Sequence, residues 1–345
     1  MTEVAIRKPL PFDATKLDKL LDDAGIDVLI ATSKHNVQYL LGGHRSLFFD
    51  YMDATGLSRY LPLVVYPKGA PGKAAFIGHR LENHQREVQP FWTPETQTTS
   101  SGSVDAMQKA IAYVAKAGLK PGRVGIELPF LPADAAAALR GALPDSQMKD
   151  AVFVLERLRA RKRPDELAML RRASDLVIES MQAVIDNHAP GTTKRDLVES
   201  LRREETNRGL IFEYCLITCG TSLNRAASDQ RWEKGDILSL DSGGNYHGYI
   251  GDLCRMAIMD AEPDAELKEH LAEIETIQRA AMKPIKAGVM GGDIYAAAES
   301  LMHKSGNAKH MHFIAHGMGL VSHEAPRLTA TGPVPYDDYD AGRPL

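Results

Sequence analysis

Two aspartates eleven positions apart have the residue type and spacing that could do chemistry. Asp241 ends one apolar run, and Asp252 begins the next, after breaks at Gly243-Gly244 and Gly248. We expect the two runs to form adjacent antiparallel strands, on which facing side chains lie ~5 Å apart. Two ionised carboxylates at this distance repel each other and need a shared proton or a cation between them. Such pairs suit Mn²⁺, Mg²⁺, Fe²⁺ or Zn²⁺. Asp241 could instead terminate a turn, and Asp252 could pair with Arg255.

A histidine cluster follows further along the chain. His312, His316 and His323 lie within twelve positions and make up a quarter of the twelve histidines. A zincin helix needs a glutamate directly after its first histidine, which is absent here, and the segment runs into glycines, so we expect a strand and a turn. On a strand, His312 and His316 point to the same face because their spacing is even. A neutral imidazole among carboxylates is a normal metal ligand. His312 could equally be a hydrogen-bonded packing residue.

The surrounding elements predict two segments with a boundary near residue 155. Alternating strands and helices in the first segment indicate a mixed α/β domain. The expected strands there are 26–32, 61–66, 74–77 and 123–127, and the expected helix is 104–120. In the second segment we expect helices from 164 onward and at 193–209, 265–287 and 293–306, with strands at 214–218, 237–241, 253–259 and 311–315. The basic run 157–163 between the segments is expected to be a solvated linker.

Composition excludes several classes of protein. Lysine and arginine total 41 against 45 acidic residues, and this excess of negative charge argues against a nucleic-acid partner. No apolar run approaches the ~18–20 residues that span a bilayer, and the amino end lacks the apolar core of a secretory signal. Three cysteines cannot all pair, which fits a reducing compartment. We therefore expect a cytoplasmic protein without a membrane or nucleic-acid partner.

Taken together, these pieces resemble the pita-bread metallohydrolases, which include methionine aminopeptidase, Xaa-Pro aminopeptidase, prolidase and creatinase. The shared marks are Asp241 and Asp252 with Gly248-Tyr249 between them, Arg255, His316-Gly-Met-Gly-Leu, and His323-Glu-Ala-Pro. Residues 27–42 and the linker 158–167 resemble creatinase and Xaa-Pro aminopeptidase, whereas methionine aminopeptidase lacks such an amino-terminal domain. The resemblance implies an α/β (α+β) fold, with a creatinase-like domain over 1–155 and a pita-bread catalytic domain over 156–345.

The resemblance also assigns roles to residues. Asp241, Asp252 and His316 would be metal ligands, His323 would stabilise the tetrahedral intermediate, and His312 would lie beside the substrate carbonyl. The implied activity is metal-dependent hydrolysis of an amide or peptide C–N bond by a metal-activated hydroxide, most like an Xaa-Pro aminopeptidase or dipeptidase. The implied cofactors are two divalent ions, Mn, Co, Zn or Fe. The alternatives are a creatinase-like hydrolase of a small non-peptide amide and an inactive binding module on the same fold.

Two departures from the family pattern bear on this assignment. Family members complete the site with two glutamates further along, and this sequence stops at Leu345, so we expect it to be a fragment of a longer chain. Xaa-Pro peptidases also carry a histidine where Asn224 stands here. An asparagine side chain can donate a hydrogen bond but cannot transfer a proton, which weakens a strict proline-peptidase reading and leaves room for another amide substrate.

An aromatic-rich segment near the amino end provides a candidate for substrate recognition. Residues 44–60 contain four aromatic side chains, and they could form a loop that packs on its own domain. By resemblance to creatinase-like homodimers, this loop would instead line the active site of the partner subunit. Arg45 or Arg59 would then contact a carboxylate of the peptide or small amide substrate.

Overall fold

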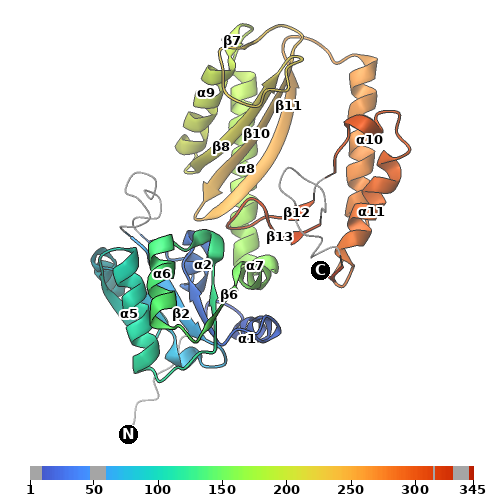
Figure 1. Cartoon of the computed structure of the whole chain (residues 1–345). Coiled ribbons are helices and arrows are strands. Elements are labelled where there is room, and N and C mark those ends of the chain that lie inside the picture. The colour runs from blue at the N-terminus through green and yellow to red at the C-terminus, as the bar shows by residue number, and fades with distance from the viewer. Residues whose placement is uncertain (1–9, 47–59, 314, 329–341) are drawn as a thin grey trace. The chain divides into compact units, whose positions relative to one another are not determined.

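Backbone contacts divide the chain into two units, Met1–Arg159 and Ala160–Leu345. The structure is a computed structural model, and it describes residues 10–46, 60–313, 315–328 and 342–345 (Figure 1). The sequence places the domain boundary after residue 155, which stays a prediction. Within these described residues, no helix combines the length and the apolar character needed to cross a membrane.

The first unit contains a mixed sheet that, in its described part, has six strands in the order β4-β3-β2-β1-β5-β6. The central strand β1 is antiparallel to β2 and parallel to β5. The strands are β1 Val28–Ala31, β2 Leu63–Pro67, β3 Ala75–His79, β4 Glu95–Ser100, β5 Arg123–Ile126 and β6 Gln147–Asp150. The four predicted strands are confirmed as β1, β2, β3 and β5. The two strands at the edges of the sheet, β4 and β6, were not predicted because their sequences are mostly polar.

Helices pack against this sheet and complete its core (Figure 1). The predicted helix 104–120 is α5, which begins one residue earlier and ends at Lys116, before Gly118. The apolar faces of α5 and α6 join Ile30, Val65 and Ile77 in one buried cluster. The helices of this part of the chain are α1 Ala14–Asp23, α2 Lys34–Leu40, α4 Asn83–Val88, α5 Ser103–Lys116, α6 Ala133–Ala142 and α7 Val152–Ala160, with 3₁₀ turns η3 Pro71–Lys73, η4 Arg80–Glu82 and η5 Leu128–Phe130.

The second unit contains an antiparallel sheet in the order β11-β10-β8, formed by β8 Ile211–Cys219, β10 Ile237–Tyr246 and β11 Tyr249–Ile258. Two helices, α8 Pro164–Asp186 and α9 Lys194–Asn207, pack on one face of this sheet (Figure 1). Alternate residues of β10, such as Leu238 and Leu240, are buried under these helices. Asp241 therefore lies on the opposite face, because successive side chains of a strand point to opposite sides.

The rest of the second unit is built from two helices that pack against each other and from short strand pairs (Figure 1). These elements are α10 Ala265–Met282, α11 Gly291–Met302, η6 Ala308–His310, β7 Thr192–Thr193 with β9 Arg231–Trp232, and β12 His316–Gly317 with β13 Glu324–Arg327. Helix α10 ends at Met282, before the predicted residue 287, because Pro284 has no backbone N–H to donate to the helix. The predicted strand 311–315 is wrong, since its described residues form no strand and pairing begins at His316.

The basic run between the two segments is not the solvated linker that the sequence suggested. Arg159 is 1% exposed and donates a hydrogen bond to the side chain of Asn36. Lys162 is also largely buried, with 9% of its side chain exposed. Long basic side chains bury their charge only where an acceptor compensates it, and sequence composition alone does not locate that acceptor.

Candidate metal centre

A tight hairpin between β10 and β11 positions the two aspartates. Its turn is formed by His247 and Gly248, whose φ angles of 52° and 98° are typical of a two-residue type I′ hairpin. The side chain of Asn245 accepts a 2.7 Å hydrogen bond from the backbone N–H of Gly248 and fixes this turn. The predicted break at Gly248 is thus confirmed. The predicted break at Gly243-Gly244 is wrong, because both glycines lie inside β10.

The register of this hairpin places the carboxylates on the same face, but not directly opposite each other. Asp241 pairs with Cys254, and Asp252 pairs with Gly243. The two aspartates are therefore diagonal neighbours, with a typical spacing of ~7–8 Å between Cα atoms, which remains within reach of one site. Proximity to Asp252, added to the larger effect of burial, raises the pKa of Asp241. A cation would relieve this repulsion.

Gly243 creates the space in which a tyrosine reaches Asp252. Tyr214 on β8, Gly243 on β10 and Asp252 on β11 form one row across the sheet. A Cβ atom on Gly243 would lie 2.3 Å from the ring of Tyr214, so the tyrosine crosses the sheet where the glycine leaves room. Burial and the nearby carboxylate of Asp252 raise the pKa of Tyr214. The hydroxyl of Tyr214 therefore keeps its proton beside Asp252.

A second short hairpin brings two histidines to Asp252. His316 begins β12, and His323 directly precedes β13. The two imidazoles stack with ring centres 3.8 Å apart, and Nε2 of His323 lies 3.6 Å from Oδ2 of Asp252. Ligand atoms of Asp252, His316 and His323 all lie within 4.8 Å of one another. That limit is near twice the typical metal–ligand distance of ~2.0–2.2 Å, so small side-chain rotations would let all three hold one ion.

The backbone contact of His316 and the pKa of His323 suit metal binding. Nδ1 of His316 lies 3.0 Å from the carbonyl oxygen of Gly317, which places the ring proton on Nδ1 and the lone pair on Nε2. Burial and the neighbouring His316 lower the pKa of His323, so its imidazole is neutral at neutral pH. One carboxylate and two imidazoles form a donor set that fits a divalent transition metal.

Asp241 is close to this cluster but has another partner. The guanidinium of Arg225 donates a hydrogen bond to Oδ2 of Asp241. Arg225 lies in the loop between β8 and β9, and its carbonyl oxygen accepts a 2.9 Å hydrogen bond from the N–H of Ile217, which folds the loop back along β8. The structure thus brings Asp252 and His316 together with His323, while it places Asp241 in an ion pair.

The other predicted site residues lie elsewhere. Asn224 is exposed, and its backbone carbonyl accepts a 2.5 Å hydrogen bond from the buried Lys194. His312 is exposed and outside the cluster. Arg59 lies outside the described residues. The roles assigned to these residues and to Arg45 stay predictions.

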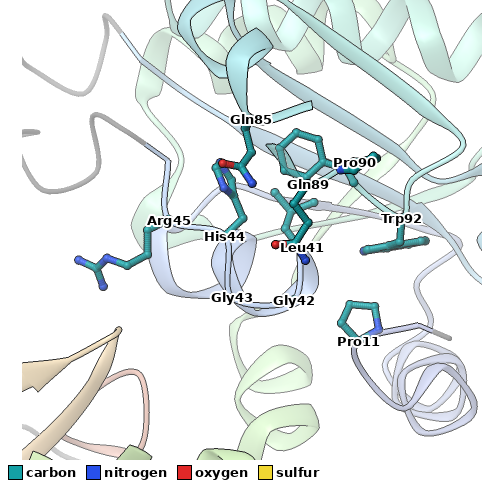
Figure 2. A pocket seen from close by; sticks show the side chains of 11 residues that line it. Pro11, Leu41, Gly42, Gly43, His44, Arg45, Gln85, Gln89, Pro90 and Trp92 are labelled. Atoms are coloured by element: carbon teal, nitrogen blue, oxygen red, sulfur yellow. The ribbon is translucent and has the colours of Figure 1, made fainter. Parts of the chain in front are cut away.

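Arg45 lines a pocket of about 490 Å³ in the first unit (Figure 2). In Figure 2 its guanidinium points away from Trp92 at the other side of the pocket. Arg45 contacts the Gln38 side chain at 3.5 Å. Next to it, the imidazole of His44 lies 2.7 Å from the buried carboxylate of Glu82.

Three residues of the second unit that shape the cluster were missed from sequence. Tyr214 was read only as part of a strand, Arg225 was passed over beside Asn224, and Lys162 was placed in a solvated linker. An arginine next to an expected active-site position was a usable signal. The other two depend on strand register and on a contact between distant segments.

Comparison with known proteins identifies the family. Residues 168–342, just over half of the chain, match metallopeptidase family M24. The chain belongs to this family. Residues 14–161 match the creatinase/prolidase N-terminal domain. These matches confirm the predicted resemblance and fold class, and they identify the chain as a member of a family of metal-dependent peptide hydrolases.

Individual relatives of this M24 chain span nearly all of it. A probable dipeptidase, PepE, of Mycobacterium tuberculosis is 28% identical, over 89% of this chain and 79% of the relative. An Xaa-Pro dipeptidase of Pyrococcus horikoshii is 22% identical, over 91% of this chain and 83% of the relative. The solved structure of an Xaa-Pro dipeptidase from Bacillus anthracis has a TM-score of 0.75 at 22% identity, covering 91% of this chain and 83% of the other. At that identity the structural likeness shows the fold alone.

Proposed function

We propose that this chain hydrolyses dipeptides with divalent metal held at Asp252 and His316, and that Asp241 joins them as a ligand. The observation that carries the proposal is the cluster of Asp252, His316 and His323, with ligand atoms within 4.8 Å of one another beside a second carboxylate. The names of two relatives support the substrate class, since one is a probable dipeptidase and the other an Xaa-Pro dipeptidase.

A bound divalent ion would polarise the substrate carbonyl and lower the pKa of water. The chain's own residues do the rest. The protonated hydroxyl of Tyr214 lies beside Asp252, and the contact of His316 Nδ1 with the carbonyl oxygen of Gly317 leaves Nε2 as the nitrogen that can bind the metal. From its position 3.6 Å from Asp252, His323 could act as a third ligand or donate a hydrogen bond to the carbonyl oxygen as it becomes negative. His312 would contact the substrate beside them.

We propose two metal ions, Mn, Co, Zn or Fe. Two carboxylates on one face support this number, because each can supply oxygen ligands to a divalent ion. Arg225 would compete with the second ion for Asp241, because its guanidinium bonds to Oδ2 of that carboxylate.

Three polar residues outside the cluster concern the substrate. Asn224 replaces the histidine expected in Xaa-Pro peptidases, so we propose that proline is accepted but not required. Arg45 and Arg59 would bind the substrate carboxylate across a homodimer. We also propose a reducing, cytoplasmic location, which is supported by the fact that none of the three cysteines forms a disulfide.

A dipeptide panel with metal analysis tests the proposal. The chain, loaded with Mn²⁺ or Co²⁺, is assayed on matched Xaa-Pro and Xaa-Ala dipeptides and on creatine, beside Asp252→Asn as the site variant and Asp229→Asn as an exposed control. We expect metal-dependent release of amino acids from both dipeptide classes, lost only in Asp252→Asn. Hydrolysis of creatine alone would instead favour the small-amide alternative. Binding of metal without turnover of any substrate would favour the inactive module.

A further inference from the structure

One buried ion pair of the second unit lies at the turn that connects the two histidines. Nζ of Lys162 donates a 2.7 Å hydrogen bond to Oε1 of Glu324, with side-chain exposures of 9% and 0%. Lys162 belongs to the short segment between α7 and α8, whereas Glu324 begins β13. The same ammonium lies 3.4 Å from the carbonyl oxygen of Ala160. The contact therefore ties the start of this unit to the segment that carries the candidate ligands.

The side chain of Glu324 lies inside the turn that connects the two histidines. Glu324 directly follows His323, and its backbone pairs with Gly317, which directly follows His316. Its carboxylate lies against Gly319, where a Cβ atom would come within 2.2 Å of Oε1. The side chain thus fills the inside of the turn, and the missing Cβ of Gly319 is what makes room for it.

The same turn is fixed to the strand that carries Asp252. The carbonyl oxygen of Gly319 accepts a 2.9 Å hydrogen bond from the N–H of Ile250, and Sδ of Met318 accepts one of 3.3 Å from the N–H of Asp252. Any displacement of Glu324 would therefore move the turn relative to Asp252. Removal of a residue that orients metal ligands without binding the metal itself typically lowers metal affinity about 10–100-fold.

We propose that the Lys162–Glu324 ion pair is a positioning device that sets the spacing of His316 and His323 around Asp252, and so the metal affinity of the site. Glu324 is not a ligand in this assignment, because its carboxylate is fully buried and bonded to Lys162. The inference rests on the proposed metal site, but not on the identity of the substrate.

Titration with Co²⁺, followed by its visible absorption and by competition with a chelator, tests the proposal. Lys162→Met removes the ammonium, Lys162→Arg restores the charge, and Arg161→Met is a matched control, since Arg161 is the exposed neighbour in the same segment. We expect Co²⁺ affinity to fall at least about tenfold in Lys162→Met, with an altered absorption spectrum, and to recover partly in Lys162→Arg. Arg161→Met should match the wild type.

A double variant separates positioning from simple charge compensation. Lys162→Met removes one cation from the buried carboxylate of Glu324 and so destabilises this unit, whereas Lys162→Met/Glu324→Gln removes both charges. If the pair positions the histidines, the folded double variant still binds Co²⁺ at least about tenfold more weakly than the wild type. Wild-type affinity and spectrum in the double variant would overturn the inference while leaving the proposed function intact. A wild-type chain that binds no Co²⁺ would overturn both.

Discussion

Replacement of Glu205 by glutamine should make the second unit more stable at high pH. Glu205 lies on α9 under the sheet and is completely buried. Its Oε1 is 3.0 Å from the hydroxyl oxygen of Ser242, and that hydroxyl is 2.7 Å from the carbonyl oxygen of Tyr214. A hydroxyl has one proton, so if Ser242 donates to Tyr214 the carboxyl group of Glu205 must be the donor to Ser242. The geometry therefore favours a protonated Glu205.

The energetic consequence follows from the pKa. Burial, opposed by Ser242 and Arg202 and assisted by Glu213, raises the pKa of Glu205 from 4.5 to about 7. Between these values the folded chain holds a proton that the unfolded chain has released, so stability falls as the pH rises through this interval. The cost is fully expressed above pH 7 and amounts to about 3 kcal/mol at ~1.4 kcal/mol per pH unit. Most of this cost, about 2–3 kcal/mol, appears between pH 5 and pH 8.

Urea unfolding at pH 5, 6, 7 and 8 measures the effect. The chain has two tryptophans, so in a Trp92→Phe background the buried Trp232 reports on the second unit alone. We expect Glu205→Gln to gain about 2–3 kcal/mol over the parent as the pH rises from 5 to 8. Glu204→Gln, on the same helix in a partly exposed pair with Arg208, should change stability by about 0.5 kcal/mol or less at every pH. A difference between Glu205→Gln and its parent that does not vary with pH would refute the protonated carboxyl.

Three further predictions concern the site. Gly243→Ala should displace the Tyr214 ring and lower the free energy of unfolding by about 1–3 kcal/mol. Gly141→Ala, where a Cβ meets nothing within 4 Å, should be neutral or stabilising. Equal urea midpoints for the two variants would contradict this prediction. Arg225→Gln frees Asp241 from a surface ion pair worth ~1 kcal/mol at most, so it should raise the Mn²⁺ affinity measured by calorimetric titration up to about fivefold. Arg195→Gln, the control, should leave the affinity unchanged. An unchanged affinity in Arg225→Gln would show that the ion pair does not compete with metal. Alanine at both Arg45 and Arg59 should raise KM about 10–100-fold with little change in kcat, and an unchanged KM would count against their contact with a substrate carboxylate.

The sequence carried enough information for the strands that build the sheets and for the residue types of the site. Apolar runs predicted β1, β2, β3 and β5, while the polar edge strands β4 and β6 lacked that signal. The pair Asp241 and Asp252 was recognisable because glycines and a fixed spacing accompany it. Their diagonal placement was not, because the hairpin register depends on the turn at His247 and Gly248.

Contacts between distant segments were beyond sequence reasoning. His316 was assigned to the cluster from its motif, but its stacking on His323 follows from the turn between β12 and β13. Lys162 looked solvated because a basic run usually is, and only the fold shows that Glu324, 162 positions away, accepts its hydrogen bond. Arg225 likewise reaches Asp241 only because its loop folds back along β8.

The location of bound metal tests the central claim most directly. Crystals of the chain grown with Mn²⁺ and measured near the manganese absorption edge would show each ion as an anomalous difference peak. The account predicts a peak within about 2.0–2.3 Å of a carboxylate oxygen of Asp252 and of Nε2 of His316. Strong peaks elsewhere in the molecule, with none between these two side chains, would contradict it.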